Sequence, residues 1–274
     1  MEKLTMRNLV MMACAAITAL VTLILTPQLV ENLDAKQLMV IQKLDGTLDC
    51  YTEPGPKMQW LGTVTTYPRQ GSYLFDVHTE KMDTGKALQF NDGGTARLYG
   101  SVNWQMPTDC KQIVMIHKQF GSPSGIEERG VARMVNTAIQ LSGNTMTSIE
   151  SFAERKAELI DIINDQAQNG AFQMVTHQVE RTNPITNQPE KVLAAEIVRD
   201  PKTGKASRQH GSILDQFGIT LQPMSIEKLD YSTIVQEQIK QRQAAMTQVQ
   251  VSQANAQKAI QAAITAEKEG QATA

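Results

Sequence analysis

The sequence has little of what most enzymes and nucleic-acid-binding proteins need. Aromatic residues make up only 5% of the 274 residues, the formal net charge is −2, and there is no extended basic run. Nucleic-acid binding leaves a basic footprint, so this class is excluded. The three cysteines, Cys14, Cys50 and Cys110, show no C-x-x-C spacing, which argues against a zinc site and against a disulfide-rich scaffold. Ala, Gln and Met are abundant instead, a composition typical of modest cores and much helical surface.

Catalytic and cofactor motifs are missing from the sequence as well. His78, His117, His177 and His210 are scattered and form no H-x-x-x-H pair. Neither glycine-rich phosphate-binding motif, G-x-x-x-x-G-K-S/T or G-x-G-x-x-G, occurs. Residues 121–125 carry proline at the central position, where a nucleophile elbow requires serine. We therefore expect no catalytic residue, no cofactor and no metal, and we expect the protein not to be an enzyme.

A long apolar run near the N-terminus predicts a membrane anchor. No residue between Arg7 and Glu31 is charged, and residues 9–25 are almost wholly apolar. At about 1.5 Å per residue, this run nearly crosses a hydrocarbon core of about 30 Å. Residues 1–30 are therefore predicted to be the uncleaved anchor of a single-pass membrane protein. Its candidate anchor residues are Leu9, Ile17, Leu20, Leu23 and Leu25.

Three other interpretations of this run are weaker. A signal peptide would need small residues at its cleavage site, but Leu-Ile-Leu-Thr-Pro follows at 23–27. A lipoprotein signal at Cys14 conflicts with an apolar run that continues well beyond that cysteine. A buried core helix is rarely apolar on all sides over such a length.

The flanking charges bear on orientation. Lys3 and Arg7 precede the anchor, and Lys36 and Lys43 follow it, so the positive-inside rule leans slightly toward a cytoplasmic N-terminus in a bacterial-type inner membrane. Cys50 and Cys110 then lie across the membrane, where oxidation can occur. Because nothing in the sequence places the two cysteines together, we expect both to be buried and unpaired.

The chain beyond the anchor alternates like β-strands, then like helices, then like strands again. Asp45-Gly46 is a hairpin turn signal, and the turn-rich stretch at about 180–212 predicts an extended hairpin. Two helices are expected in the middle, the second opened by a capping box, either Thr147 with Glu150 or Ser151 with Glu154. This order predicts an α+β fold with an antiparallel sheet. The expected strands are residues 37–44, 47–51, 60–67, 72–78, 95–104, 171–179 and 217–226.

The C-terminal part predicts one long helix. Residues 224–269 contain neither Gly nor Pro, and Ala, Gln and isolated charges dominate from Tyr231 onward. An apolar stripe runs along this helix in eleven-residue steps, but it is too narrow to stabilise an isolated helix in water. We therefore expect it to pack against copies of itself; the alternative is a frayed polar tail. The candidate oligomerisation residues are Val235, Ile239, Met246, Val249 and Ile260.

The ordered set of motifs resembles the SPFH (band 7) superfamily, which includes stomatins, prohibitins and flotillins. Residues 53–56, Glu-Pro-Gly-Pro, resemble its early G-P-G turn, and Gln89-Phe90-Asn91-Asp92-Gly93 resembles the start of its central strand. Residues 147–156 resemble its T-x-x-E-x-x-x-x-R helix start, and residues 217–230 its last strand. The resemblance covers nearly the whole chain, although the stretch from Met174 to Gln216 is longer than the family's usual strand pair.

The resemblance implies a domain layout and a function. It implies an anchor at 1–30, an SPFH-like α+β region at 31–230 and an assembly helix at 231–274. It implies a non-enzymatic scaffold whose copies form a large ring or dome that partitions a membrane microdomain. The alternative is a regulator that cages or restrains a membrane-anchored AAA protease. The expected partners are membrane lipid, further copies of the chain and, in the alternative, a membrane protease or other membrane protein.

Overall fold

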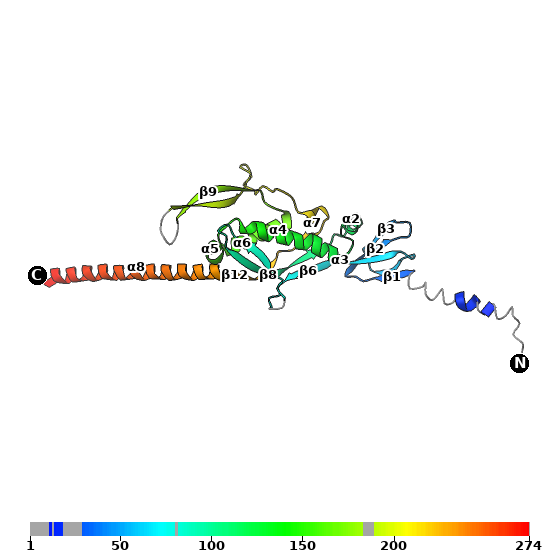
Figure 1. The fold of residues 1–274 in the computed structure, drawn as a ribbon, viewed down its shortest axis with the longest axis horizontal. Coiled ribbons are helices and arrows are strands. Elements are labelled where there is room, and N and C mark those ends of the chain that lie inside the picture. The colour runs from blue at the N-terminus through cyan, green and yellow to red at the C-terminus, as the bar shows by residue number, and fades with distance from the viewer. Residues whose placement is uncertain (1–10, 13, 19–28, 80–81, 183–188, 274) are drawn as a thin grey trace, which may run out of the picture.

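The computed structural model describes residues 11–12, 14–18, 29–79, 82–182 and 189–273. Strands β1 to β5 lie at one end of this elongated molecule, and a long C-terminal helix projects from the other (Figure 1). No helix within the described residues is both long and apolar enough to cross a membrane. Most of the predicted anchor lies outside the described residues, including Leu9, Leu20, Leu23 and Leu25.

The first five strands form an N-terminal region, residues 30–68. The β2–β3 hairpin confirms the predicted turn, because Gly46 adopts a φ of 83° and Asp45 Oδ1 accepts a hydrogen bond from the Thr47 N–H at 2.9 Å. A second pair, β1 with β4, lies beside this sheet. All pairings are antiparallel: β1 (Val30–Leu33) with β4 (Gly55–Met58), and β2 (Gln37–Gln42) with both β3 (Leu48–Tyr51) and β5 (Thr63–Pro68).

The main domain is built on a five-stranded antiparallel sheet around one long strand, β8 (Thr95–Gln105). Every other strand of the sheet pairs with β8, and its alternating pattern buries Leu98, Val102 and Trp104 on the core side. The antiparallel sheet predicted from the sequence is thus confirmed. The partners of β8 are β6 (Gln70–Phe75), β7 (Lys86–Gln89), β11 (Thr220–Leu221) and β12 (Ser225–Tyr231).

Helices pack on this sheet and complete the core (Figure 1). Helix α4 contacts both α6 and β7, and its residues Val135 and Ile139 are fully buried. Helix α5 begins at a capping box in which Thr147 and Glu150 bond reciprocally, which is the first of the two predicted alternatives. The helices are α2 (Cys110–Phe120), α3 (Pro123–Gly125), a π-helical turn (Ile126–Val131), α4 (Ala132–Gly143), α5 (Ser148–Ala153), α6 (Lys156–Asn169) and α7 (Ile213–Gln216).

A two-stranded antiparallel ribbon rises from the main domain where the sequence predicts an extended hairpin. It consists of β9 (Met174–Thr182) and β10 (Pro189–Ile197), so its first strand starts several residues before the predicted stretch at about 180–212. His177 and Glu196 lie 3.2 Å apart on the ribbon.

Helix α8 (Thr233–Thr273) is the long C-terminal helix that the sequence predicts. At about 1.5 Å per residue, its 41 residues span roughly 60 Å. Together with the antiparallel sheets and packed helices, it confirms the α+β class.

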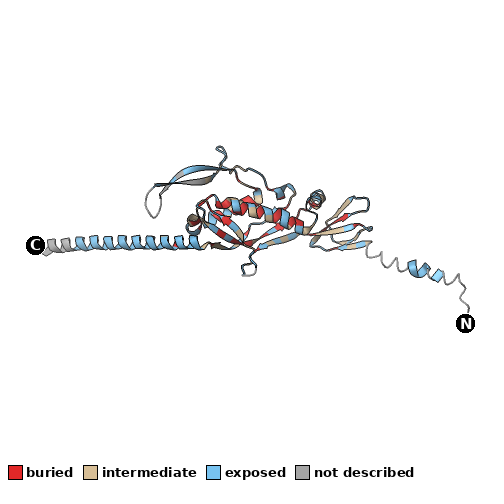
Figure 2. Ribbon diagram, in the orientation of Figure 1, coloured by how far each residue is buried: buried red, intermediate tan, exposed pale blue. Residues whose placement is uncertain are grey.

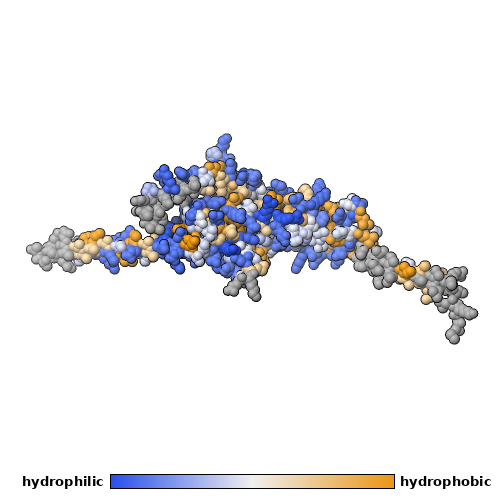
Figure 3. Space-filling model, in the orientation of Figure 1, coloured by the Kyte–Doolittle hydropathy of each residue, from blue (hydrophilic) through white to orange (hydrophobic). Residues whose placement is uncertain are grey.

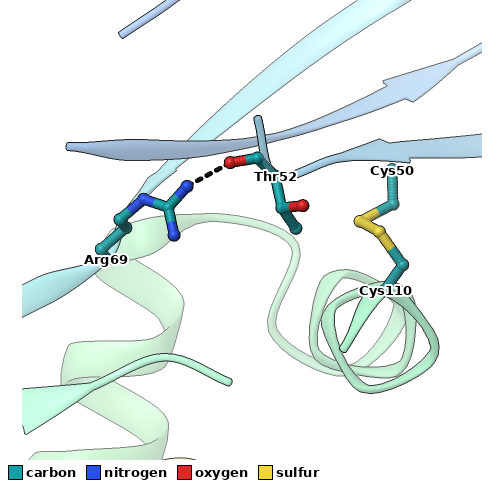
Figure 4. The surroundings of a disulfide bond; sticks show 4 residues. All are labelled: Cys50, Thr52, Arg69 and Cys110. Carbon is teal, nitrogen blue, oxygen red and sulfur yellow. Dashed lines mark hydrogen bonds between the residues drawn. A yellow bond between two sulfur atoms is a disulfide. The ribbon is translucent and has the colours of Figure 1, made fainter. Parts of the chain in front are cut away.

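The expectation for the cysteines is wrong. Cys50 of β3 and Cys110 of α2 are half-buried and form a disulfide, with their Cα atoms 5.6 Å apart (Figure 4). Sixty residues separate the two cysteines, and only the packing of α2 against β3 brings them together. A sequence pattern carries no signal for such a contact.

Candidate membrane-facing surface and assembly helix

Apolar side chains gather on the surface at the end of the molecule where β1 begins. Hydrogen-bonded pairing places them together, because Val30 is opposite Met58 and the Gln59 N–H donates to the Leu29 carbonyl at 2.8 Å. Figure 3 shows apolar surface at this end of the folded region. We call this surface the apolar tip; it consists of Val30, Leu44, Met58, Trp60 and Leu61, all exposed.

The turn that carries Trp60 and Leu61 is strained. Their φ angles are 52° and 59°, both left-handed, and the Gly62 N–H closes the turn on the Gln59 carbonyl at 2.9 Å. Such turns normally take Asn and Gly at the two central positions. A left-handed L-residue costs roughly 1–2 kcal/mol, and strain of this kind is retained mainly at functional sites.

The same turn holds two large apolar side chains in water. Trp60 is 57% exposed and Leu61 is 42% exposed, so the turn combines backbone strain with unburied apolar area. Position 62 requires glycine because a Cβ on Gly62 would lie 2.6 Å from the Gln42 carbonyl oxygen. Burial of these side chains against an apolar surface would be favourable by about 25 cal/mol for each Å² of apolar area removed from water.

The charges around the tip are balanced rather than basic. Lys43 forms an ion pair with Asp49 at 2.7 Å, and Lys57 lies over the Tyr51 ring at 5.6 Å. Asp45 is held by Thr47, whose hydroxyl hydrogen bond lowers the pKa of its carboxyl group. Any attraction of the tip to a membrane therefore rests on apolar contact and not on a polybasic patch.

The predicted assembly residues of α8 fall into two groups. Val235 and Ile239 are buried in the main core, so they complete the domain itself. Met246, Val249 and Ile260 are about half exposed, and Figure 2 shows the described part of α8 exposed beyond its first two turns.

The exposed part of α8 is nearly uncharged. Lys258 is the only charged residue between Arg242 and Glu267. A helix that is exposed on all sides, weakly apolar and almost without charged pairs is poorly stabilised alone in water. The exposed part of the apolar stripe begins at Met246.

Of the anchor candidates, only Ile17 lies in the described residues, where it is exposed on a helical segment. No cluster of three or more metal-ligating side chains occurs among the described residues. The structure therefore brings Val235 and Ile239 into the core and leaves Met246, Val249 and Ile260 on a free surface. Sequence reasoning missed the tip because residues 60–67 read as a strand; the Trp-Leu pair gives no turn signal.

The family comparison agrees with this architecture. The model of the SPFH domain / Band 7 family matches residues 33–269, which is most of the chain. The chain belongs to the SPFH/band 7 family. SPFH proteins are generally non-catalytic scaffolds and are typically associated with membranes. No curated protein matches the sequence.

Proposed function

We propose that this SPFH protein is a membrane-anchored, non-enzymatic scaffold subunit whose copies assemble into a large ring or dome and partition the membrane beneath it. The observation that carries the proposal is the pair of exposed apolar surfaces at opposite ends of the molecule, the apolar tip and the α8 stripe (Figure 1). The tip lies beside Leu29, where the chain emerges from the predicted anchor. Lipid is therefore the partner proposed for the tip, and further copies of the chain are the partners proposed for α8.

The disulfide supports one orientation. Bonded cysteines persist in oxidising compartments and are rare in the cytosol. The bond between Cys50 and Cys110 thus favours a folded region across the membrane from a cytoplasmic N-terminus. The charges that flank the predicted anchor weakly favour the same orientation.

Assembly through α8 is tested by adding one charge inside the stripe. Val249→Asp places a carboxylate where neighbouring helices would meet, and an unpaired buried charge is costly. The variant is expected to remain folded and membrane-bound but to lose particles of megadalton size in size-exclusion chromatography of detergent extracts. Gln248→Glu adds the same charge at the adjacent position and is the matched control.

The control is expected to elute like the wild type. Wild-type protein that elutes as a monomer or dimer, or a Val249→Asp variant that assembles normally, would refute the scaffold proposal. The alternative function, restraining a membrane-anchored AAA protease, uses the same two surfaces. It would gain support if intact particles carried a protease in a fixed ratio.

A further inference from the structure

The Cys50–Cys110 disulfide lies in an open groove between β3 and α2. The groove has a volume of about 540 Å³, and both cysteines line it together with the apolar side chains of Val114 and Met115. Figure 4 shows the bond reaching from the strand to the first turn of the helix. A disulfide that lines an open groove is accessible to attack by a thiolate.

The position of Cys110 favours its thiolate form. Cys110 is the first residue of the eleven-residue helix α2, and the Asp109 side chain makes no capping hydrogen bond. The free N–H groups and the dipole at a helix N-terminus stabilise a nearby negative charge, and so does an adjacent lysine, here Lys111. Cys110 is therefore the better leaving group of the pair.

Three charged side chains line the groove, and a fourth, Asp109, directly precedes α2. Lys111 and Lys118 of α2 line it, and so does Asp49 of β3. Asp49 is paired with Lys43 at 2.7 Å, which offsets its charge. Asp109 precedes the helix and is exposed, so water screens its carboxylate.

We propose that Cys50–Cys110 is an exchangeable disulfide and that a dithiol protein of the thiol–disulfide oxidoreductase class acts on it in this groove. One thiolate of the dithiol attacks Cys50 Sγ, forms a mixed disulfide and expels the Cys110 thiolate, which then takes up a proton. The second thiolate of the dithiol then attacks the oxidoreductase sulfur that is bonded to Cys50. This closes the disulfide of the oxidoreductase and releases the Cys50 thiolate, which also takes up a proton. The dithiol loses two electrons and becomes a disulfide, and the chain gains two thiols.

The intact bond acts as a latch that holds β3 against α2. Leu38, Val40 and Tyr67 of the same region remain buried in the shared core, so β2 and β5 stay docked after reduction. β3 contacts α2 at the bond and pairs only with β2 among the described strands. Leu48 and Tyr51 of β3 still pack on the two apolar clusters, so reduction is expected to loosen β3 and the hairpin turn that carries Leu44 of the apolar tip without unfolding them.

The test uses the full chain in detergent with Cys14→Ser, which leaves only the two bonded cysteines. The native protein is incubated with dithiothreitol without denaturant, and the free thiols are counted by maleimide gel shift. We expect complete opening under native conditions. With glutathione in place of dithiothreitol, peptide mass spectrometry is expected to find the trapped adduct mainly on Cys50. Opening only after unfolding, or an adduct mainly on Cys110, overturns the proposal.

Two surface variants separate the local effect from a general charge effect. Lys111→Glu is expected to slow native opening several-fold, because it removes the cation beside the Cys110 thiolate. Lys118→Glu makes the same charge change in the last turn of α2 and is expected to have a smaller effect. Equal effects contradict the helix N-terminal explanation. Hydrogen exchange is expected to rise at residues 48–51 on reduction and to stay unchanged in β8; unchanged exchange at 48–51 refutes the latch.

Discussion

The middle of the molecule and its two ends use apolar residues in opposite ways. In the main domain, residues such as Leu98, Ile139 and Val235 are almost completely buried against one another. At the apolar tip and on the stripe of α8, residues of the same kind are between 42% and 79% exposed. Helix α8 makes the contrast within one element, because its first two turns bury Val235 and Ile239, whereas residues 240–265 are exposed apart from the half-buried Arg242.

The contrast shows where the stability of each part comes from. The main domain buries its core residues against one another, so these contacts stabilise it within the single chain. The two ends carry apolar surface that the described residues leave exposed, and apolar surface of this kind is typical of protein or membrane contact sites. Substitutions at the ends are therefore expected to affect association, and substitutions in the middle are expected to affect folding.

The largest expected effect is at the start of α8. Val235→Asp puts an unpaired carboxylate at a position only 1% exposed, at a cost of about 4 kcal/mol or more. We expect a chain that fails to fold or that melts far below the wild type in circular dichroism. Ile234→Asp, at a neighbouring position 71% exposed, is the matched control and is expected to melt like the wild type. Equal losses at both positions would remove the distinction between the buried and exposed faces of α8.

The second effect is at the tip. Replacing Trp60 with Asn and Leu61 with Gly supplies the residues that left-handed turns prefer and removes the exposed apolar area. We expect the free energy of unfolding to rise by about 1–2 kcal/mol, because the backbone strain is relieved. A gain in stability at a natural position would be consistent with strain kept for function.

Lipid contact at the tip has its own readout. In the full chain reconstituted into vesicles with brominated lipids, Trp60 fluorescence is expected to be quenched. Trp60→Phe leaves only Trp104, which is buried in the main domain, and the quenching is expected to vanish. Quenching that persists in this variant would mean that the tip is not the membrane contact.

The smallest effect concerns pH at the joint between the N-terminal region and α2. The Tyr67 hydroxyl and His117 Nδ1 form a hydrogen bond at 2.7 Å; burial lowers the pKa of His117 and raises that of Tyr67 to about 12. His117 therefore takes up a proton more readily in the unfolded chain, where its pKa has the ordinary histidine value of about 6.5, than in the folded chain. Stability from this pair is present above that pH and is lost as the pH falls through the lowered pKa.

His117→Gln removes this titration. The drop in melting temperature between pH 7.5 and pH 5.5, chosen to bracket the histidine pKa of about 6.5, is expected to be smaller in the variant than in the wild type. An identical drop in both proteins would show that the pair does not contribute to the pH dependence.

Local signals in the sequence predicted the local structure. Asp45-Gly46 gave the β2–β3 turn, and Thr147 with Glu150 gave the start of α5, because hydrogen bonds within a few residues decide both features. The Trp60-Leu61 turn could not be predicted, since neither residue favours a left-handed backbone and tertiary contacts of Gly62 hold it there.

The remaining differences from the sequence prediction depend on contacts far apart in the chain. The burial of Val235 and Ile239 follows from where the start of α8 packs on the main core, which an apolar stripe alone does not reveal. The bond between Cys50 and Cys110 joins residues that are sixty positions apart. Helical periodicity predicted the stripe but not which of its members the domain itself would cover.

The joint around Arg69 has a mechanical consequence. The backbone passes from the N-terminal region to the main sheet once, between β5 and β6. There Arg69 donates hydrogen bonds to the Ala35 carbonyl and to the Thr52 carbonyl, the second of which Figure 4 shows. The disulfide is a second covalent connection in parallel with this crossing. A pull between a lipid-held tip and an assembled α8 would therefore be shared between two covalent connections, and with the bond open one backbone segment would be the sole covalent connection beside the shared core.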